Sequence, residues 1–416
     1  MREMKDSGIE WVGAIPQDWQ LSKIGSLYTQ RNEKVSDKDY QPLSVTMQGI
    51  LPQLATAAKT DDGDNRKLVR VGDFAINSRS DRRGSCGISP LDGSVSLINI
   101  ILTPRTAMHP GYYNWLFHTT LFADEFYKWG HGIVADLWTT RWQEMKSITV
   151  PVPEYAEQER IAAFLDAECA EIDTVLEKTR ASIEEYKKLK QAIITQAVTK
   201  GIRGDRPMKD SGIEWIGDIP AEWSVVPFSK FARVSANLVN PSDYQDYLQV
   251  SPENIEKDSG KLLSCKTVSE VGVESWNHFF HKGQILYSKI RPKLNKVCIA
   301  PFDGLCSADM YPIDTDNISK FVVYTILSND FNQQVAMITE NRVKMPKINQ
   351  KELSKIIVVL PADRMEQQEI VDYLDGECGK IDALIAKKQQ YLTEIENYKK
   401  SLIYEYVTGK KEVLPL

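Results

Sequence analysis

The sequence contains a long internal repeat, and this repeat limits the possible folds more than any other feature. Residues 4–19 (MKDSGIEWVGAIPQDW) return as residues 208–223 (MKDSGIEWIGDIPAEW), with 12 of 16 positions identical. A second match follows later in each half, where residues 157–173 align with residues 366–382 and share 9 of 17 positions. The chain is therefore two copies of one plan: a short tryptophan-bearing lead, a globular body and a charged helix.

The repeat divides the 416 residues into seven segments. The first copy comprises a lead at 1–20, a globular domain at 21–155 and a long helix at 156–200. The second copy comprises a linker and lead at 201–223, a globular domain at 224–362 and a long helix at 363–410, followed by a tail at 411–416. Residues 24–147 and 228–355 show little identity to each other, so the leads and helices repeat while the globular bodies between them differ in sequence. This indicates two modules with one task and different targets, although neutral drift of two structural domains is the alternative.

Residues 156–200 predict one long helix, because neither proline nor glycine interrupts them and apolar residues recur at alternating spacings of four and three. The second copy repeats this heptad seam in register. The predicted pairing residues are Ile172, Leu176, Ile183, Tyr186 and Ile193 in the first helix, and Ile381, Ile385, Leu392, Ile395 and Leu402 in the second. The seams predict an antiparallel coiled-coil pair, in which Lys190 and Lys399 are polar positions that can set the register. Packing of each helix on its own globular domain is the alternative.

The two globular bodies alternate short strand-like runs with clusters of turn residues. Strands are predicted at 94–102, 284–287 and 355–360, and helices at 110–129 and 319–335. The predicted fold class is therefore mixed α/β (α+β). It consists of two globular domains separated by two long helices that form an antiparallel coiled-coil pair, with a pseudo-twofold internal repeat.

Composition excludes several classes of protein. With 42% hydrophobic and 26% charged residues, the chain is not disordered over most of its length. No apolar stretch approaches about 18 residues and the N-terminus has no apolar signal segment, so we expect no membrane partner. The six cysteines form no C-x-x-C pair, which favours a reducing, cytoplasmic location without disulfides.

Motifs for catalysis and cofactor binding are absent from the sequence. It contains no phosphate loop, no G-x-G-x-x-G fingerprint and no H-E-x-x-H zinc motif. His278 and His281 lie three apart, but no further ligands follow at metal-site spacing. The repeated carboxylates are better explained as caps or helix contacts than as catalytic groups; they are Asp166, Glu168, Asp375 and Glu377. We therefore expect no catalytic centre and no metal site, which points to recognition or scaffolding.

Basic loops are the candidate binding sites. The net charge is −6, so a nucleic-acid site would have to be local. In the second domain the candidate DNA-binding residues are Lys289, Arg291, Lys293, Lys296, Arg342, Lys344 and Lys347. In the first domain they are Arg79, Arg82 and Arg83, with His131 and Arg141 near the same face. Lysine suits phosphate contacts and arginine suits base edges. Solvated loops are the alternative, but patches in corresponding thirds of both bodies favour nucleic acid.

The repeated frame resembles the specificity subunit of Type I restriction–modification systems. The resemblance is carried by the two leads, by the helix openings at 157–161 and 366–370, and by the helix closings Val198-Thr199-Lys200-Gly201 and Val407-Thr408-Gly409-Lys410. It covers essentially the whole chain. It implies that the two globular domains are target recognition domains, each reading one half of a bipartite double-stranded DNA target. It also implies that the helix pair is a spacer that sets the unread gap.

The resemblance further implies partners and a division of labour. The chain would be non-catalytic, would bind no cofactor and would seat two methyltransferase subunits and restriction or translocase subunits. S-adenosylmethionine, ATP and Mg are expected on those partners. A coiled-coil scaffold whose globular domains bind proteins is the alternative function, whereas a fused enzyme is disfavoured because no methyltransferase or nuclease motif occurs. The lead tryptophans could serve internal packing or partner contact, and we expect packing; they are Trp11, Trp19, Trp215 and Trp223.

Overall fold

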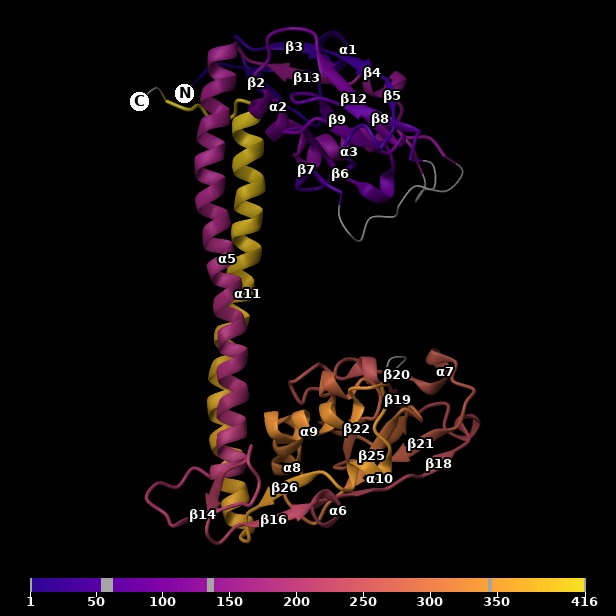
Figure 1. Ribbon diagram of the computed structural model, residues 1–416, viewed down its shortest axis with the longest axis vertical. Helices are drawn as coiled ribbons and strands as arrows, with labels where there is room; N and C mark the ends of the chain where they lie inside the picture. Colours follow the sequence, from indigo (N-terminus) through magenta and orange to yellow (C-terminus); the bar gives the residue numbers. More distant parts are fainter. Residues whose placement is uncertain (1, 54–62, 133–137, 343–345, 415–416) are drawn as a thin grey trace. The chain divides into compact units, whose positions relative to one another are not determined.

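The computed structural model describes residues 2–53, 63–132, 138–342 and 346–414 (Figure 1). The chain forms two compact units. Unit 1 comprises Met1–Arg180 and Gln390–Leu416, and unit 2 comprises Ala181–Gln389. Each unit therefore holds one lead, one globular body and one half of each long helix. The two ends of the chain belong to the same unit, unit 1.

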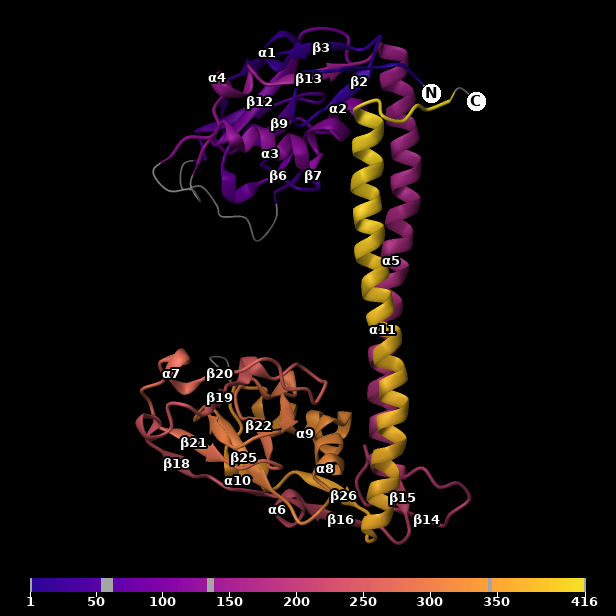
Figure 2. The same cartoon turned by 180° about the vertical axis from the view of Figure 1, so that it is seen from behind.

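The two long helices are α5, Tyr155–Lys200, and α11, Arg364–Val407, close to the ranges expected from the heptad seams. Each ends at a glycine with positive φ, Gly201 at 75° and Gly409 at 70°, a conformation that glycine adopts without steric cost. Within each unit the halves of α5 and α11 lie side by side (Figures 1 and 2).

Matched ion pairs cross between the two helices inside each unit. In unit 1, Lys399 Nζ lies 2.6 Å from Asp173 Oδ1; in unit 2, Lys190 Nζ lies 2.7 Å from Asp382 Oδ1. Each pair joins a seam lysine of one helix to the aspartate that occupies the equivalent place in the other copy. The partner number falls as the residue number rises, so the helices run antiparallel.

The ten predicted pairing residues lie on the protected side of these helices. Leu176, Ile183, Ile381 and Leu402 are buried, and the other six are half-buried. Ring contacts add to the pairing: the rings of Phe164 and Tyr406 are 4.4 Å apart in unit 1. In unit 2 the ammonium of Lys388 lies 5.7 Å from the ring centre of Tyr186.

Unit 1 is built around a four-stranded antiparallel sheet in the order β10-β9-β12-β4. Its strands are β4 (Tyr28–Arg31), β9 (Phe74–Asn77), β10 (Cys86–Ile88) and β12 (Asn99–Pro104). A second sheet has the order β11-β8-β5, and its strands are β5 (Lys34–Val35), β8 (Arg66–Val69) and β11 (Gly93–Val95). The strand pairs are β1 (Met4–Asp6) with β2 (Ala14–Pro16), β3 (Gln20–Lys23) with β13 (Thr149–Val152), and β6 (Leu43–Thr46) with β7 (Gly49–Pro52).

Short helices cover the unit 1 sheet. They are α1 (Ile24–Leu27), α2 (Pro110–Phe117), α3 (Thr120–Lys128), α4 (Trp142–Met145) and the 3₁₀ turn η1 (Ser80–Arg82). The core between sheet and helices is rich in aromatic side chains, among them Phe74, Tyr113, Phe117 and Phe122, and it continues to Leu402 and Val407 of α11.

Unit 2 repeats the four-stranded sheet in the order β17-β25-β22-β23, with β17 (Arg233–Val234), β22 (Ile285–Ser288), β23 (Val297–Ile299) and β25 (Met310–Asp314). Its second sheet has five strands in the order β18-β21-β24-β19-β20; they are β18 (Leu238–Val239), β19 (Leu248–Val250), β20 (Lys266–Thr267), β21 (Asn277–Phe280) and β24 (Gly304–Cys306). The strand pairs are β14 (Met208–Asp210) with β15 (Asp218–Pro220) and β16 (Ser224–Pro227) with β26 (Ile357–Leu360).

Apart from the additional helix α7, the α-helices of unit 2 follow the same order as those of unit 1. They are α6 (Phe228–Phe231), α7 (Val268–Val271), α8 (Ser319–Leu327), α9 (Asn329–Thr339) and α10 (Gln350–Leu353), with 3₁₀ turns η3 (Pro241–Asp243), η4 (Pro252–Asn254) and η5 (Pro292–Leu294). The globular bodies, which share little sequence identity, therefore share one core topology. The predicted mixed α/β (α+β) class is confirmed.

Three sequence predictions about elements need correction. The expected single helices at 110–129 and 319–335 are each two helices, because Thr119 and Ser328 cap a second helix by accepting the N–H of Phe122 and Phe331. The expected strand at 94–102 is broken at 96–98, where the N–H of Asn99 turns back to the carbonyl of Ser96.

The lead tryptophans do not all pack internally. Trp11, Trp19 and Trp223 are buried as expected, whereas Trp215 is 48% exposed, so the packing prediction is wrong for that residue. Trp19 Nε1 donates to Glu157 at 2.9 Å, and Trp223 Nε1 donates to Glu366 at 3.0 Å. Each lead is thus fastened to the opening turn of a long helix.

Two further expectations concern cysteines and membranes. All six cysteines are free, in agreement with the expected absence of disulfides. Across the part of the chain that the structure describes, none of the helices combines the length and apolar character needed to cross a bilayer.

Candidate nucleic-acid interface

The basic loop of unit 2 connects β22 to β23 and is held against a second predicted basic segment. The N–H of Arg291 donates to the carbonyl of Pro346 at 2.8 Å, and the N–H of Ile348 donates to the carbonyl of Lys289 at 2.9 Å. Ile290 forms an isolated antiparallel bridge with Lys347. The structure therefore brings together two patches that are more than fifty residues apart in the sequence.

Four of the unit 2 candidates are engaged within the protein. Lys296 Nζ donates to the carbonyl of Pro252 at 2.7 Å, and Lys289 Nζ lies 5.3 Å from the ring centre of Tyr311. Lys347 Nζ pairs with Asp309 at 3.1 Å. Arg342 forms a two-pronged contact with Glu352, one arm of which is 3.1 Å long. The Arg342 guanidinium holds the pKa of the Glu352 carboxyl below its usual range. Because these four side chains already have partners within the protein, they are weaker candidates for contacting DNA.

Arg291 and Lys293 are exposed, and among the described residues no acidic partner lies within ion-pair distance of either. The loop that presents them is fixed. Arg291 and Asn295 have left-handed backbone conformations, with φ of 43° and 46°, and the buried side chain of Asn295 donates to the carbonyl of Leu327 at 3.2 Å. Lys344, the remaining candidate, lies outside the described residues.

The basic loop of unit 1 connects β9 to β10 and is held in the same manner. Thr139 forms isolated bridges with both Arg79 and His131, and the N–H of Ser80 donates to the carbonyl of Trp138 at 2.9 Å. The backbones of Arg79 and His131 are therefore both bridged to one short segment, while the common face expected for their side chains stays a prediction.

The unit 1 cations differ in how they are paired. Arg82 lies 3.8 Å from Asp81, and Arg83 pairs with Asp124. Arg79 and Arg141 are exposed, and within the described ranges neither side chain has an acidic partner at ion-pair distance. Arg141 begins α4, where its own N–H donates to Glu144 Oε2 at 3.0 Å.

The two basic loops occupy the same place in the shared topology. β9 and β10 correspond to β22 and β23, because each pair forms the same edge of the four-stranded sheet. Each connection contains a 3₁₀ turn and is bridged to the segment before a four-residue helix. Sequence reasoning placed the patches only in corresponding thirds of the bodies, because the equivalence depends on strand pairing.

Two side chains near these loops were not selected from the sequence. Trp138, 38% exposed, lies in the segment bridged to the Arg79 loop. An exposed aromatic beside cations is a recurrent nucleic-acid platform, and this pattern was the available signal. His278 is buried, and its Nδ1 has no hydrogen-bond partner among the described residues. Burial and the nearby Lys289 charge lower its pKa, which disfavours a positive charge there.

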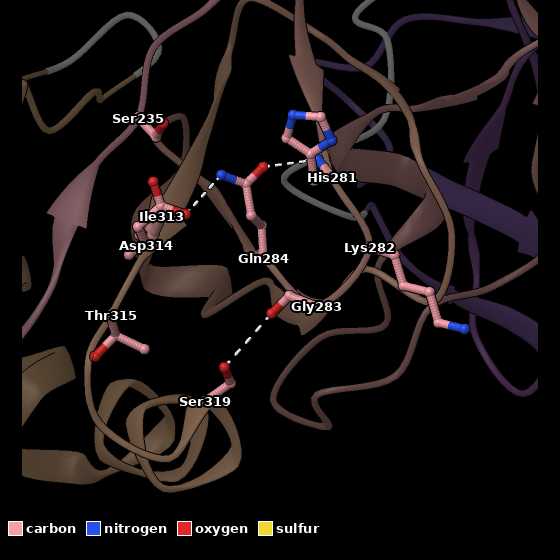
Figure 3. A pocket seen from close by; sticks show the side chains of 9 residues that line it. All are labelled: Ser235, His281, Lys282, Gly283, Gln284, Ile313, Asp314, Thr315 and Ser319. Carbon is pink, nitrogen blue, oxygen red and sulfur yellow. Dashed lines mark hydrogen bonds between the residues drawn. The ribbon is translucent and has the colours of Figure 1, made fainter.

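A polar pocket of about 470 Å³ lies in unit 2 away from the basic loop (Figure 3). The side chain of Gln284 spans it, donating to Asp314 at 2.7 Å and accepting the N–H of His281 at 2.7 Å. Gln284 precedes β22, whereas Lys289 follows it, so pocket and loop lie at opposite ends of that strand. In the described part of the chain, no cluster of three or more histidine, cysteine or acidic side chains is placed to hold a metal.

Comparison with known proteins finds a matching family model and similar curated proteins. A family model described as "Type I restriction modification DNA specificity domain" matches residues 230–397. The Type I restriction enzyme EcoDI specificity subunit of Escherichia coli is 34% identical over 286 residues, covering 64% of this chain and 63% of that protein. The chain is therefore similar to specificity subunits of Type I restriction–modification systems, and the match to their DNA specificity domain lies in residues 230–397.

A second relative is similar over a comparable length. A putative type I restriction enzyme MjaX specificity subunit of Methanocaldococcus jannaschii is 26% identical over 283 residues, covering 65% of this chain and 61% of its own length. The chain thus spans less than two thirds of the curated relatives it matches.

A solved structure shows the same fold over nearly the whole chain. It is described as the structural basis of complex assembly and conformational transition of the type I R-M system. The TM-score is 0.72 at 14% identity, with 95% of this chain and 99% of the other covered.

Proposed function

We propose that this chain is the DNA-reading, non-catalytic subunit of a Type I restriction–modification complex, and that each unit reads one half of a bipartite double-stranded target. The observation that carries the proposal is the pair of equivalent loops, β9–β10 and β22–β23. Each presents an exposed arginine without an acidic partner among the described residues, Arg79 in unit 1 and Arg291 in unit 2. Two unlike loops on one scaffold suit two half-sites of different sequence.

The chemistry of these loops fits groove recognition. An arginine fork can donate two hydrogen bonds to the O6 and N7 of guanine, which contributes about 1–3 kcal/mol of discrimination. Lysine at the rim, such as Lys293, suits phosphate contacts that position the protein without reading sequence. Because both loops are bridged to a second segment, little conformational freedom is lost on binding.

The helix pair is proposed to set the gap between the half-sites. The ion pairs Asp173–Lys399 and Lys190–Asp382 favour one register of α5 against α11. Two tethered readers gain affinity from their high effective concentration only if the linker geometry lets both engage. Helix register and length would therefore select the spacing.

The partners and cofactors belong to the proposal as well. Two methyltransferase subunits and restriction or translocase subunits would assemble on this chain in the cytoplasm, and they would carry S-adenosylmethionine, ATP and Mg. The chain would supply recognition, and methylation with the base flipping it requires would occur in the partners.

The test is methylome sequencing of a methylation-free host that expresses the cognate methyltransferase subunit with or without this chain. A split adenine-methylated motif that depends on the chain is the expected result, and it gives both half-sites and the gap. If an active methyltransferase yields no new motif, the scaffold alternative, in which the globular domains bind proteins, takes its place.

A further inference from the structure

One position of the repeat differs sharply between the two units. Trp11 in unit 1 is 7% exposed and packs edge-on against Phe122, with ring centres 5.9 Å apart. Trp215, its counterpart in unit 2, is 48% exposed and lines an open pocket of about 310 Å³. The other lining residues are Ala192, Thr195, Gln196, Thr199, Lys200, Ile216, Asn329 and Asp330.

The two units also differ in a ring beside the lead. In unit 1, Tyr404 of α11 donates to the carbonyl of Val12 at 3.0 Å, beside the lead. The equivalent position in α5 is Thr195, which carries no ring; its hydroxyl accepts the N–H of Asn329 at 2.9 Å, and the residue lines the pocket. The aromatic partner is lost as well, since Phe331, the counterpart of Phe122, packs on Phe228 instead.

The second difference is one of charge. Leu121, the second residue of α3, corresponds to Asp330, the second residue of α9; each lies two residues after the equivalent capping residue, Thr119 or Ser328. Asp330 is half-buried, and none of the hydrogen bonds or ion pairs of the described residues involves its carboxylate. A carboxylate in the first turn of a helix is stabilised by the helix dipole, which accounts for the charge of Asp330 but not for its place in a pocket.

The lysine in this pocket is already committed elsewhere. Lys200 Nζ donates to the carbonyls of Ile216, at 2.7 Å, and Asp218. Lys410 makes the corresponding contact with Val12 in unit 1, at 2.6 Å, although it follows the helix-ending glycine while Lys200 precedes its own. Lys200 therefore fastens the lead, as its counterpart does. Its charge acts on the Asp330 carboxylate, but among the described residues no ion pair joins the two side chains.

We propose that this pocket receives a lysine or arginine side chain of a methyltransferase subunit, held between the indole face of Trp215 and the carboxylate of Asp330. A cation over an indole face is attracted by the ring quadrupole, and the carboxylate adds a direct ion pair. Nucleic acid is disfavoured as the occupant because Asp330 repels phosphate. The identity of the partner rests on the proposed function. Since Trp11 is buried in unit 1 and Trp215 is exposed in unit 2, the two units offer a methyltransferase subunit unequal surfaces.

The test measures binding of the cognate methyltransferase subunit to the full chain by titration calorimetry and native mass spectrometry. Thr195→Tyr fills the pocket with the ring that unit 1 possesses, and Asp330→Asn removes the charge with almost no change of shape. Each variant is expected to weaken one of two binding events by about tenfold and to leave the other unchanged. The controls are Trp276→Ala, at a tryptophan 60% exposed outside the pocket, and Asp316→Asn, an exposed carboxylate outside it.

The outcomes separate the two proposals. If the wild-type chain binds methyltransferase subunits and both pocket variants bind within twofold of wild type, the pocket proposal alone is wrong. If the controls weaken binding as much as the pocket variants, it is also wrong. If the wild-type chain binds no methyltransferase subunit, both the pocket proposal and the proposed function fail.

Discussion

The two units attach their leads to the long helices in the same way but differ in the globular bodies. Both leads are tied to a helix by the same set of contacts, in which a glutamate accepts a tryptophan N–H and an arginine: Glu157 with Trp19 and Arg2 in unit 1, Glu366 with Trp223 and Arg206 in unit 2. The second sheet has three strands in unit 1 and five in unit 2. The comparison teaches that the repeat preserves the attachment of each body to the helices, while the bodies themselves have diverged.

The attachment gives the largest expected effect. Glu366 is 2% exposed, so Glu366→Ala would leave the buried Arg206 guanidinium with only the exposed Glu222 as an acidic partner among the described residues, and would destabilise unit 2 by about 3 kcal/mol. Glu157→Ala, at a less buried site, is expected to cost unit 1 about 2 kcal/mol. Hydrogen exchange of the full chain in increasing urea would report each unit separately. Equal loss of protection in both units from either variant would contradict this division.

The recognition loops give the next largest effect. Arg291→Ala should weaken discrimination at one half-site by about 1–3 kcal/mol, and Arg79→Ala should do so only at the other. Lys293→Ala is the matched control, expected to weaken binding to all sequences evenly and to reduce its salt dependence. Binding of the assembled complex to DNA with single changes in either half-site tests this. Loss at both half-sites from Arg291→Ala would point to unfolding or to a role other than reading.

A smaller effect is expected from the ion pairs between the two long helices, which can be compared between the units. Asp382 pairs with both Lys190 and Lys261, so Asp382→Lys would place three ammonium groups together and destabilise the helix pair of unit 2 by about 1 kcal/mol. A second change, Lys190→Asp, should restore the pair between the helices but not the contact with Lys261. Asp173→Lys in unit 1 is expected to have a smaller effect, because Asp173 is 59% exposed. Thermal unfolding and the gap in the methylated motif are the measurements. A double exchange no more stable than the single variant would show that the pair does not set the register.

The smallest effect is expected in the pH dependence of stability, where a comparison of wild type with a Glu366 variant isolates the contribution of one carboxylate. Burial raises the pKa of Glu366, but hydrogen bonds from Arg206 and Trp223 hold it below 4.5 overall. A carboxyl whose folded pKa is lowered stabilises the fold above its unfolded pKa, and this contribution is lost as pH falls through the folded pKa. Unit 2 should therefore lose stability below about pH 4.5, and less steeply in Glu366→Gln. Parallel pH curves for the two proteins would rule out this role.

Local patterns predicted much of the fold. Heptad spacing gave the long helices, because helix periodicity is a property of neighbouring residues. The broken elements at 110–129 and 94–102 were missed because a capping threonine and a turn at 96–98 interrupt apolar runs that look continuous in sequence.

The candidate interface was predicted only in outline. Clusters of arginine and lysine marked two loops that the structure shows to be topologically equivalent, and their role in DNA binding stays a prediction. Charge patterns alone could not distinguish Arg291, which is exposed, from Arg342, which pairs with Glu352. Ion-pair partners come from segments whose proximity depends on the fold, so composition does not show which cations are free.

The sequence by itself determined the two-copy plan, the helical seams and the family frame, because repetition and periodicity are written in the order of residues. Only the tertiary structure decided that Trp11 is enclosed and Trp215 is open, and that two loops with unrelated sequences occupy one place on the sheet. The physical reason is the same in both cases. Burial and pairing depend on the volume and charge of residues distant in the chain, here Tyr404 in one unit and Thr195 in the other.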